Sequence, residues 1–230
     1  TTAFAIAFMV ATLYFLTRAT IAIAVAFYLP RRYPRLAHQQ GRRLEGIIAP
    51  LLARFGLEQP TLLQSPSPYL SCCAFGLRHQ YLLVSRGLLE GLDDEHLEAV
   101  LAHELAHFLR RDQYLNLVIL ALRSFLFFNP LVHLLCREIS QEQELACDAL
   151  AIRMGQRPLN YAQSLLIVCR QGSRVPTLWD PATSGFLTRS ATMRRRVTAV
   201  LERGGMEGPE RRPLLFAVTG SLSLGLFFVC

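Results

Sequence analysis

Two histidines one helical turn apart are the strongest signal in this chain, and they stand in the run His103-Glu104-Leu105-Ala106-His107. Residues four apart on a helix project from the same face, so His103 and His107 can bind one metal ion while Glu104 lies beside them. A match to this short pattern arises by chance in roughly one chain of this composition per hundred. The run therefore predicts a helix that carries two ligands of a metal site.

The residues before the two histidines also favour a helix. Acidic side chains occupy positions 93–95, where a helix N-terminus favours negative charge, and no Pro or Gly separates them from His103. His103 and His107 fall on the flank of an apolar stripe, whereas histidines that only fill a core would lie within it. We therefore interpret the two histidines as metal ligands. The stripe is formed by Leu97, Leu101, Leu105 and Phe108.

A catalytic zinc needs three protein ligands and one open position for water, so a third ligand must lie elsewhere. Glu144 and Asp148 stand four residues apart and would share one face of a helix. We predict Glu144 as the third ligand of Zn²⁺, and Asp148 as the hydrogen-bond partner of the distal nitrogen of His103. Glu138 and Glu142 are competing candidates, which are more easily explained as a solvated charged face.

The predicted chemistry is peptide hydrolysis, in which Glu104 accepts a proton from the attacking water and passes it to the leaving amine. The spacing leaves His133, Tyr161 and an arginine near Arg194 as alternatives for an oxyanion donor. The rival interpretation is a non-catalytic signalling or scaffold protein with a structural metal. Cys147, otherwise interpreted as a packing residue, is the one side chain that would close such a site as a fourth ligand.

Apolar stretches near both ends of the chain indicate a membrane protein. The chain has 230 residues, of which 52% are hydrophobic, and its mean hydropathy is +0.29. Residues 1–29 are almost wholly apolar except for Arg18, and they are long enough to cross a bilayer. We predict a transmembrane helix over 1–30, a zinc metallopeptidase domain over 31–212 with its core at about 61–200, and the start of a further transmembrane helix over 213–230.

Arginines flank both ends of the middle region, which by the positive-inside rule places it in the cytoplasm of a multi-pass cell-membrane protein. The net charge of +7 would then attract the chain to anionic lipid, so the lipid bilayer is a predicted partner. Nucleic acid is not expected as a direct partner, because the arginines show no aromatic-interleaved or helix-turn-helix pattern. The flanking arginines are Arg31, Arg32, Arg35, Arg42, Arg43, Arg194, Arg195, Arg196, Arg203, Arg211 and Arg212.

Two further segments shape the expected domain. Residues 69–75 and 80–85 resemble short strands, which predicts a small sheet beside the histidine helix and an edge strand that holds substrate in extended form. The pattern does not identify the edge strand. Residues 114–136 are apolar, but the part before Asn129-Pro130 spans only about 20 Å as a helix. Because this is short of a bilayer core of ~30 Å, we favour a helical hairpin that is buried in the domain or dips into the membrane surface, over a transmembrane pair.

In their order, these motifs resemble the BlaR/MecR-type signal-transducer membrane metallopeptidases of peptidase family M56, over roughly residues 65–200. The resemblance implies a mostly helical α+β fold of gluzincin type with a small sheet, flanked by transmembrane helices. It also implies cleavage of a cytoplasmic or membrane-proximal protein in signal transduction, with a transcriptional repressor or the protein itself as candidate substrates. The motifs are the two-histidine run followed by Arg110-Arg111-Asp112, then Phe128-Asn129-Pro130-Leu131-Val132, then Glu144-Leu145-Ala146-Cys147-Asp148.

The M48 membrane proteases share the two-histidine motif and the Glu-x-x-x-Asp motif, so an M48-like quality-control protease is the alternative within the same enzyme class. The cysteine before Asp148 and the Asn129-Pro130 pair are closer to the sensor type. No penicillin-binding sensor domain is found in this stretch, so antibiotic sensing is not implied.

Overall fold

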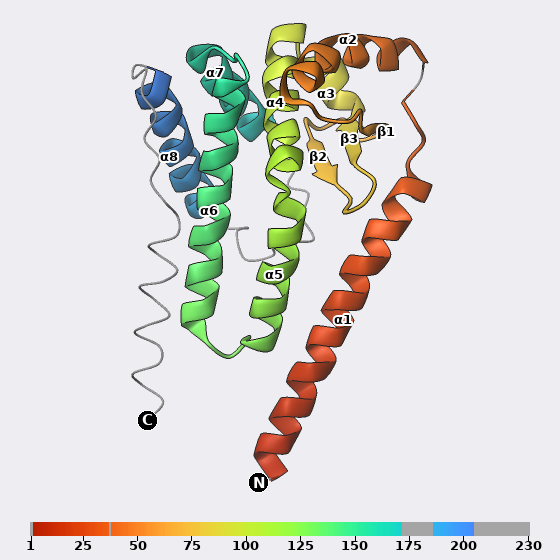
Figure 1. Ribbon diagram of the computed structural model, residues 1–230. Coiled ribbons are helices and arrows are strands. Elements are labelled where there is room, and N and C mark those ends of the chain that lie inside the picture. Colours follow the sequence, from red (N-terminus) through yellow and green to blue (C-terminus); the bar gives the residue numbers. More distant parts are fainter. Residues whose placement is uncertain (1, 37, 172–185, 205–230) are drawn as a thin grey trace.

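A computed structural model describes residues 2–36, 38–171 and 186–204 of the chain. A head of helices and a small sheet carries one long helix and one helical hairpin, which extend from it in the same direction (Figure 1). The mostly helical α+β fold predicted from the sequence is confirmed. Its elements are α1 (Thr2–Arg32), α2 (His38–Phe55), β1 (Thr61–Ser65), β2 (Cys72–Phe75), β3 (Tyr81–Ser85), α3 (Arg86–Gly91), α4 (Asp94–Arg110), α5 (Asp112–Phe125), α6 (Pro130–Arg153), α7 (Pro158–Gln171) and α8 (Phe186–Gly204).

The sheet has the strand order β1-β3-β2, with β1 parallel and β2 antiparallel to β3. The two predicted strands are present over shorter ranges, as β2 and β3, whereas β1 was not predicted. Gly76 makes the turn after β2 with a φ of 101°, and a Cβ there would lie 2.0 Å from the carbonyl oxygen of His79. Because β2 is an edge strand that packs against α4, it borders the histidine helix directly.

The histidine helix, α4, lies at the centre of the head, between the sheet and helices α2, α6 and α7. It begins as predicted, because the Asp93 side chain accepts a hydrogen bond from the His96 N–H and negative charge fills the first turn. Its apolar stripe is fully buried in one core that joins all these elements. The helix ends at Arg111, which adopts a left-handed conformation with φ 56° and ψ 38°. Helix α5 begins at the next residue.

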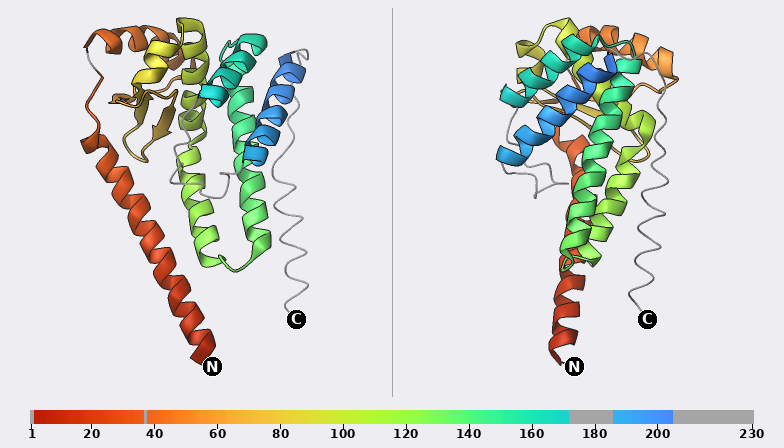
Figure 2. Two further views of the ribbon diagram at one scale, coloured as in Figure 1. Left: turned by 180° about the vertical axis from the view of Figure 1, so that it is seen from behind. Right: turned by 90° about the vertical axis from the view of Figure 1, so that its left-hand side faces the viewer.

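The predicted hairpin over residues 114–136 is formed by α5 and the start of α6. Asn129 begins α6 with its side chain accepting a bond from the Leu131 N–H, and Pro130 takes the first helical position, where its missing N–H costs nothing. The hairpin extends away from the head beside α1 (Figure 2). The rings of Tyr14 and Phe127 contact each other between α1 and the hairpin turn, with centroids 6.5 Å apart.

The predicted membrane helix coincides with α1. Among the described residues, however, no helix is both long and apolar enough to cross a membrane. The transmembrane assignment of residues 1–30 therefore gains no support from the structure and stays a prediction. Residues 213–230, predicted to begin a further membrane helix, lie outside the described part of the chain.

Candidate active site

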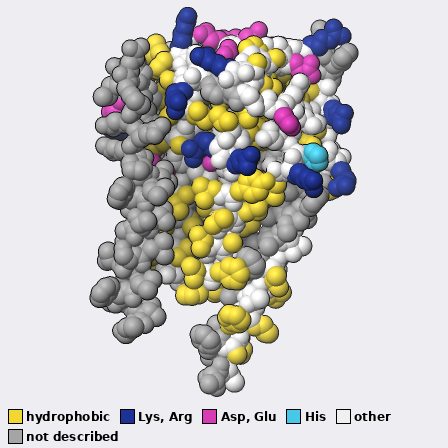
Figure 3. Space-filling model, in the orientation of Figure 1, with side chains coloured by type: hydrophobic (Ala, Val, Ile, Leu, Met, Phe, Trp, Pro, Cys, Tyr) yellow, Lys and Arg dark blue, Asp and Glu magenta, His cyan; other side chains and the backbone are white. Residues whose placement is uncertain are grey.

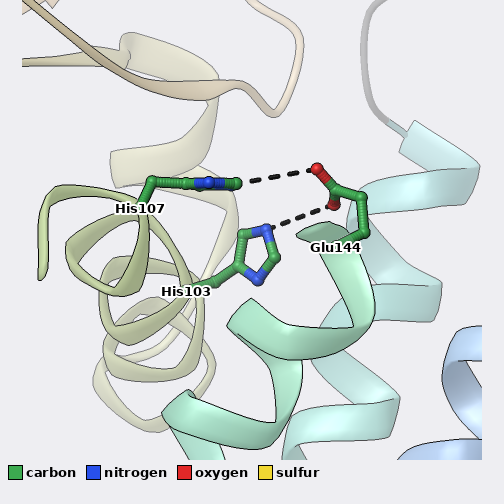
Figure 4. A group of neighbouring side chains, drawn as sticks. All are labelled: His103, His107 and Glu144. Carbon is green, nitrogen blue, oxygen red and sulfur yellow. Dashed lines mark ion pairs between the residues drawn. The ribbon is translucent and has the colours of Figure 1, made fainter. Parts of the chain in front are cut away.

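The structure brings His103, His107 and Glu144 together between α4 and α6 (Figure 4). The Nε2 atom of His103 lies 3.4 Å from Oε2 of Glu144, and Nε2 of His107 lies 3.8 Å from Oε1. One donor atom from each residue falls within 4.8 Å of the others, a spacing suited to a shared metal ion. The competing Glu138 and Glu142 instead form ion pairs with Arg195 of α8, at 3.6 Å and 2.5 Å.

The distal nitrogen of His103 faces a buried hydrogen-bonded pair. Its Nδ1 atom lies 3.1 Å from Oδ1 of Asp148 and 2.9 Å from the hydroxyl of Tyr161, which donates a hydrogen bond of 2.7 Å to the same carboxylate oxygen. This contact is compatible with the role predicted for Asp148, which stays a prediction. Tyr161 is 1% exposed and lies behind His103, on the side away from Glu144, so its position does not suit the oxyanion donor considered from the sequence.

The distal nitrogen of His107 also faces a carboxylate, that of Asp112, whose Oδ2 lies 2.9 Å from Nδ1. Sequence reasoning did not assign a role to Asp112. The sequence offers only its spacing as a signal, an aspartate five residues after the second histidine and just past the end of α4. Only the sharp turn at Arg111 brings it back to the imidazole.

Cys147 lies on the Nδ1 side of His107, and Glu144 lies on the Nε2 side. Its Sγ atom is 3.3 Å from Nδ1 of His107 and 3.2 Å from Oδ2 of Asp112. Burial and the Asp112 carboxylate raise the pKa of the Cys147 thiol far above its ordinary value, so the thiol keeps its proton and donates to Asp112. This position argues against Cys147 as a fourth ligand that closes a structural site with Glu144.

Arg196 of α8 covers the carboxylates of the site, a role that the sequence did not assign to this residue. Its Nε and Nη2 atoms donate to both oxygens of Asp148, at 2.8 Å and 2.6 Å, and Nη1 lies 2.8 Å from Oε2 of Glu144. Burial raises the pKa of each carboxyl, but Arg196 and the neighbouring His103 outweigh it, so both pKa values lie well below their ordinary range. Both side chains are therefore ionised at neutral pH.

Glu104 points toward the sheet rather than toward the other carboxylates. Its Oε2 atom accepts a hydrogen bond of 2.8 Å from the backbone N–H of Ala74 in β2. The predicted proton acceptor is thus held beside the edge strand, which resolves the question of which strand borders the site. His133 donates a hydrogen bond from Nε2 to the carbonyl oxygen of Phe127 in the hairpin. It lies roughly 16 Å along α6 from Glu144 and is too distant to serve as an oxyanion donor.

Comparison with known proteins decides the family. Residues 3–200 match the family described as BlaR1 peptidase M56. The chain belongs to this family. Membership of M56 confirms the predicted enzyme class, a zinc metallopeptidase, and the matched stretch contains the whole cluster of His103, His107 and Glu144.

Two bacterial proteins and one solved structure are also similar to this chain. The chain is 28% identical over 147 residues to regulatory protein BlaR1 of Bacillus licheniformis, and 26% identical over 178 residues to a protease HtpX homolog of Gemmatimonas aurantiaca. These matches cover 63% and 64% of the chain, but 23% and 64% of the relatives. The crystal structure of S. mikatae Ste24p shares the fold, with a TM-score of 0.51 at 18% identity over 82% of this chain and 56% of that one.

Arg196 is expected to stabilise the metal-free protein more than the metal-loaded protein. Without metal, its guanidinium neutralises two neighbouring carboxylates, those of Asp148 and Glu144. Its side chain is 12% exposed and that of Asp148 is 2% exposed, so Arg196→Met leaves a buried charge without its partner. We expect this change to lower the free energy of unfolding of the chelator-treated protein by about 3–5 kcal/mol. The matched change Arg195→Met removes a 45% exposed side chain and is expected to cost less than about 1 kcal/mol. Equal losses in denaturant unfolding would contradict this account.

Metal loading is expected to depend on pH through His103. Burial lowers the pKa of this imidazole, but the Asp148 and Glu144 carboxylates raise it to about 10 in the metal-free protein. This raised pKa stabilises the metal-free fold fully below a pH of about 6.5, and the contribution is lost as the pH rises through 10. Because zinc binds the neutral imidazole, the apparent zinc affinity should rise about tenfold per pH unit between about 7 and 9. Chelator competition at a series of pH values measures this affinity, and a zinc affinity independent of pH would refute the prediction.

Proposed function

We propose that this M56 chain is a membrane-associated zinc metalloendopeptidase that hydrolyses a cytoplasmic or membrane-proximal protein in signal transduction. The observation that carries the proposal is the convergence of His103 and His107 on Glu144, with a carboxylate behind each histidine. A structural metal site has no need of Glu104 beside it, and closes with a fourth protein ligand. The rival scaffold function therefore explains fewer of these contacts.

The residues present fit Zn²⁺. Two imidazole nitrogens and one carboxylate are the ligand set of many catalytic zinc sites, and each imidazole has its other nitrogen against a carboxylate, as zinc ligands commonly do. We assign His103, His107 and Glu144 as the ligands, and Asp148 as the residue that orients His103. When bound, the ion supplies Lewis-acid chemistry that activates a water and polarises the scissile carbonyl.

Glu104 is the proposed general base and acid. Its carboxylate accepts a proton from the attacking water and delivers it to the leaving amine. The Ala74 N–H holds Oε2 of Glu104 and leaves Oε1 available to carry the proton. Because a backbone group makes this contact, the orientation of Glu104 depends on the path of β2 and not on the identity of a neighbouring side chain.

The edge strand β2 is the proposed substrate platform. Strand β3 pairs with one side of β2, so the other side faces α4 and the Glu104 carboxylate. A peptide that adds to this edge in extended form would run past Glu104, and its main-chain hydrogen bonds would give affinity with little dependence on sequence. This arrangement suits an endopeptidase that acts within a protein chain.

The hairpin and α1 are the proposed membrane contact. On the face drawn in Figure 3, apolar side chains gather over the lower part of the molecule, whereas most Arg, Asp and Glu side chains lie on the head. Large exposed apolar side chains favour the lipid surface. Arg31 and Arg32 end α1, and Arg110 and Arg111 end α4 where α5 begins, so basic side chains are available to anionic headgroups at these positions. The exposed residues of the hairpin include Leu115, Val118, Leu122, Phe127, Phe128, Leu131, Leu134 and Leu135.

Fluorescence quenching tests this contact. In a Trp179→Phe background, Phe128→Trp should be quenched when the full chain is reconstituted in vesicles that contain brominated anionic lipid. The control Leu159→Trp lies in the head, where Leu159 is 61% exposed, and should stay unquenched. If brominated lipid leaves the fluorescence of Phe128→Trp unchanged, or quenches both variants equally, the lipid contact is contradicted.

A second candidate function is an HtpX-like membrane quality-control protease, since further curated relatives such as that of Pelotomaculum thermopropionicum, 38% identical over 90 residues, are also protease HtpX homologs. Substrate identity separates the two functions. We expect cells with the native chain to lack one intact regulatory protein that accumulates in cells with Glu104→Ala. Accumulation of many damaged membrane proteins would favour quality control, and identical proteomes would contradict both.

A further inference from the structure

The corner between α4 and α5 places a carboxylate behind the second histidine. Arg111 adopts the left-handed conformation there, which costs a residue with a side chain of order 1–3 kcal/mol. The chain reverses so sharply that Asp112, the first residue of α5, lies beside His107, five residues earlier. Asp112 is 3% exposed. A strained backbone that delivers a buried carboxylate to a metal-facing imidazole indicates that this contact has a function.

One oxygen of Asp112 receives three contacts. Besides Nδ1 of His107 at 2.9 Å, its Oδ2 atom accepts hydrogen bonds from Nε of Arg110 and from the Cys147 thiol, both at 3.2 Å. Arg110 belongs to the end of α4, whereas Cys147 belongs to α6, one turn beyond Glu144. The hydrogen bond from the Cys147 thiol to Asp112 therefore links the corner between α4 and α5 to α6, which supplies the third proposed ligand.

We propose that Asp112, held in place by the Cys147 thiol, is the positioning residue that fixes His107 with a proton on Nδ1 and with Nε2 facing Glu144. The inference rests on the proposed metal site and deepens it. A free imidazole can exchange tautomers, which puts the proton on Nε2, and it can rotate, which turns Nδ1 toward the metal site. Either change takes the unprotonated Nε2 away from the metal. An acceptor at Nδ1 removes both alternatives, and such contacts typically contribute 10–100-fold to metal affinity.

The same three residues, His107, Asp112 and Cys147, also lie close enough together to hold a metal ion of their own. Their contacts favour hydrogen bonds instead, because Oδ2 of Asp112 accepts from the Cys147 thiol and from Nε of Arg110, each at 3.2 Å. A thiol in this position acts as a neutral donor, a task that a hydroxyl can take over. This property gives the proposal a conservative rescue variant.

Zinc affinity of the full chain, measured by chelator competition, tests the proposal. Asp112→Ala should weaken binding by about 10–100-fold. Cys147→Ala should weaken it less, and Cys147→Ser should restore it, because serine keeps the donor. The control Cys136→Ala removes another buried thiol of α6 and should leave affinity unchanged. If Asp112→Ala fails to fold, Asp112→Asn keeps the side-chain volume and should bind zinc more weakly than the wild-type chain.

The tautomer of His107 provides a second readout that loss of packing alone would not move. In ¹⁵N-histidine-labelled protein, the wild-type His107 signals should show a proton on Nδ1, and Asp112→Ala should change them. Wild-type zinc affinity together with unchanged imidazole signals in Asp112→Ala would overturn the proposal. Equal zinc affinities of Cys147→Ala and Cys136→Ala would overturn the proposed role of the Cys147 thiol. A wild-type chain that binds no zinc would contradict the proposed function itself, and this inference with it.

Discussion

Glu104→Gln is expected to lower the rate of peptide hydrolysis by about 10²–10⁴-fold while zinc stays bound. Glutamine has the same volume and can still accept the Ala74 N–H through its amide oxygen, so the site keeps its shape. The amide cannot accept a proton from water, and this loss removes the proposed general base. Turnover of a peptide substrate and zinc content, both measured on the same preparation, check the result.

Glu98→Gln is the matched control for this change. Glu98 lies on the same helix and accepts a hydrogen bond from Gln156 at 2.9 Å, away from the metal cluster. Its replacement should leave hydrolysis close to the wild-type rate. If Glu104→Gln keeps wild-type turnover, another group takes the proton and the assigned role of Glu104 is wrong.

Glu144→Ala is expected to remove the third zinc ligand and to abolish hydrolysis. Zinc affinity should fall by more than the roughly 100-fold that loss of an orienting contact costs, because a direct ligand is lost. The fold should persist, since Arg196 keeps Asp148 as a partner through two hydrogen bonds. Zinc titration and circular dichroism of the metal-free variant measure the two effects separately.

Glu142→Ala provides the comparison on α6. Glu142 is two residues earlier, is 45% exposed and contacts Arg195 rather than the histidines. The Glu142→Ala variant should therefore bind zinc with wild-type affinity. Wild-type zinc stoichiometry and affinity in Glu144→Ala would exclude Glu144 from the ligand set.

Local periodicity was sufficient to predict the parts of the fold that depend on one helix. Helix α4 begins at its acidic cap and buries its leucine stripe as expected, because both features depend on neighbours within four residues. The pairing of Glu144 with the two histidines was predicted from chemistry, since a metal site needs a third ligand and the spacing of Glu144 and Asp148 offered one.

Contacts that depend on tertiary packing could not be read from local pattern. Arg196 was one of many arginines, and only the packing of α8 on α6 brings it to Asp148. Strand β1 was missed because its pairing with β3 is parallel and non-local. Asp112 was missed because no sequence rule predicts a left-handed Arg111. The residues that surround the site were therefore harder to predict than the ligands themselves.

X-ray absorption at the zinc edge of the metal-loaded full chain tests the central claim most directly. We expect two imidazole nitrogens and carboxylate and water oxygens around zinc, with no sulfur, because Cys147 lies on the Nδ1 side of His107. Loss of an oxygen ligand in Glu144→Ala would complete the assignment. A sulfur atom in the zinc shell of the wild-type chain, or a shell without histidine, would contradict it.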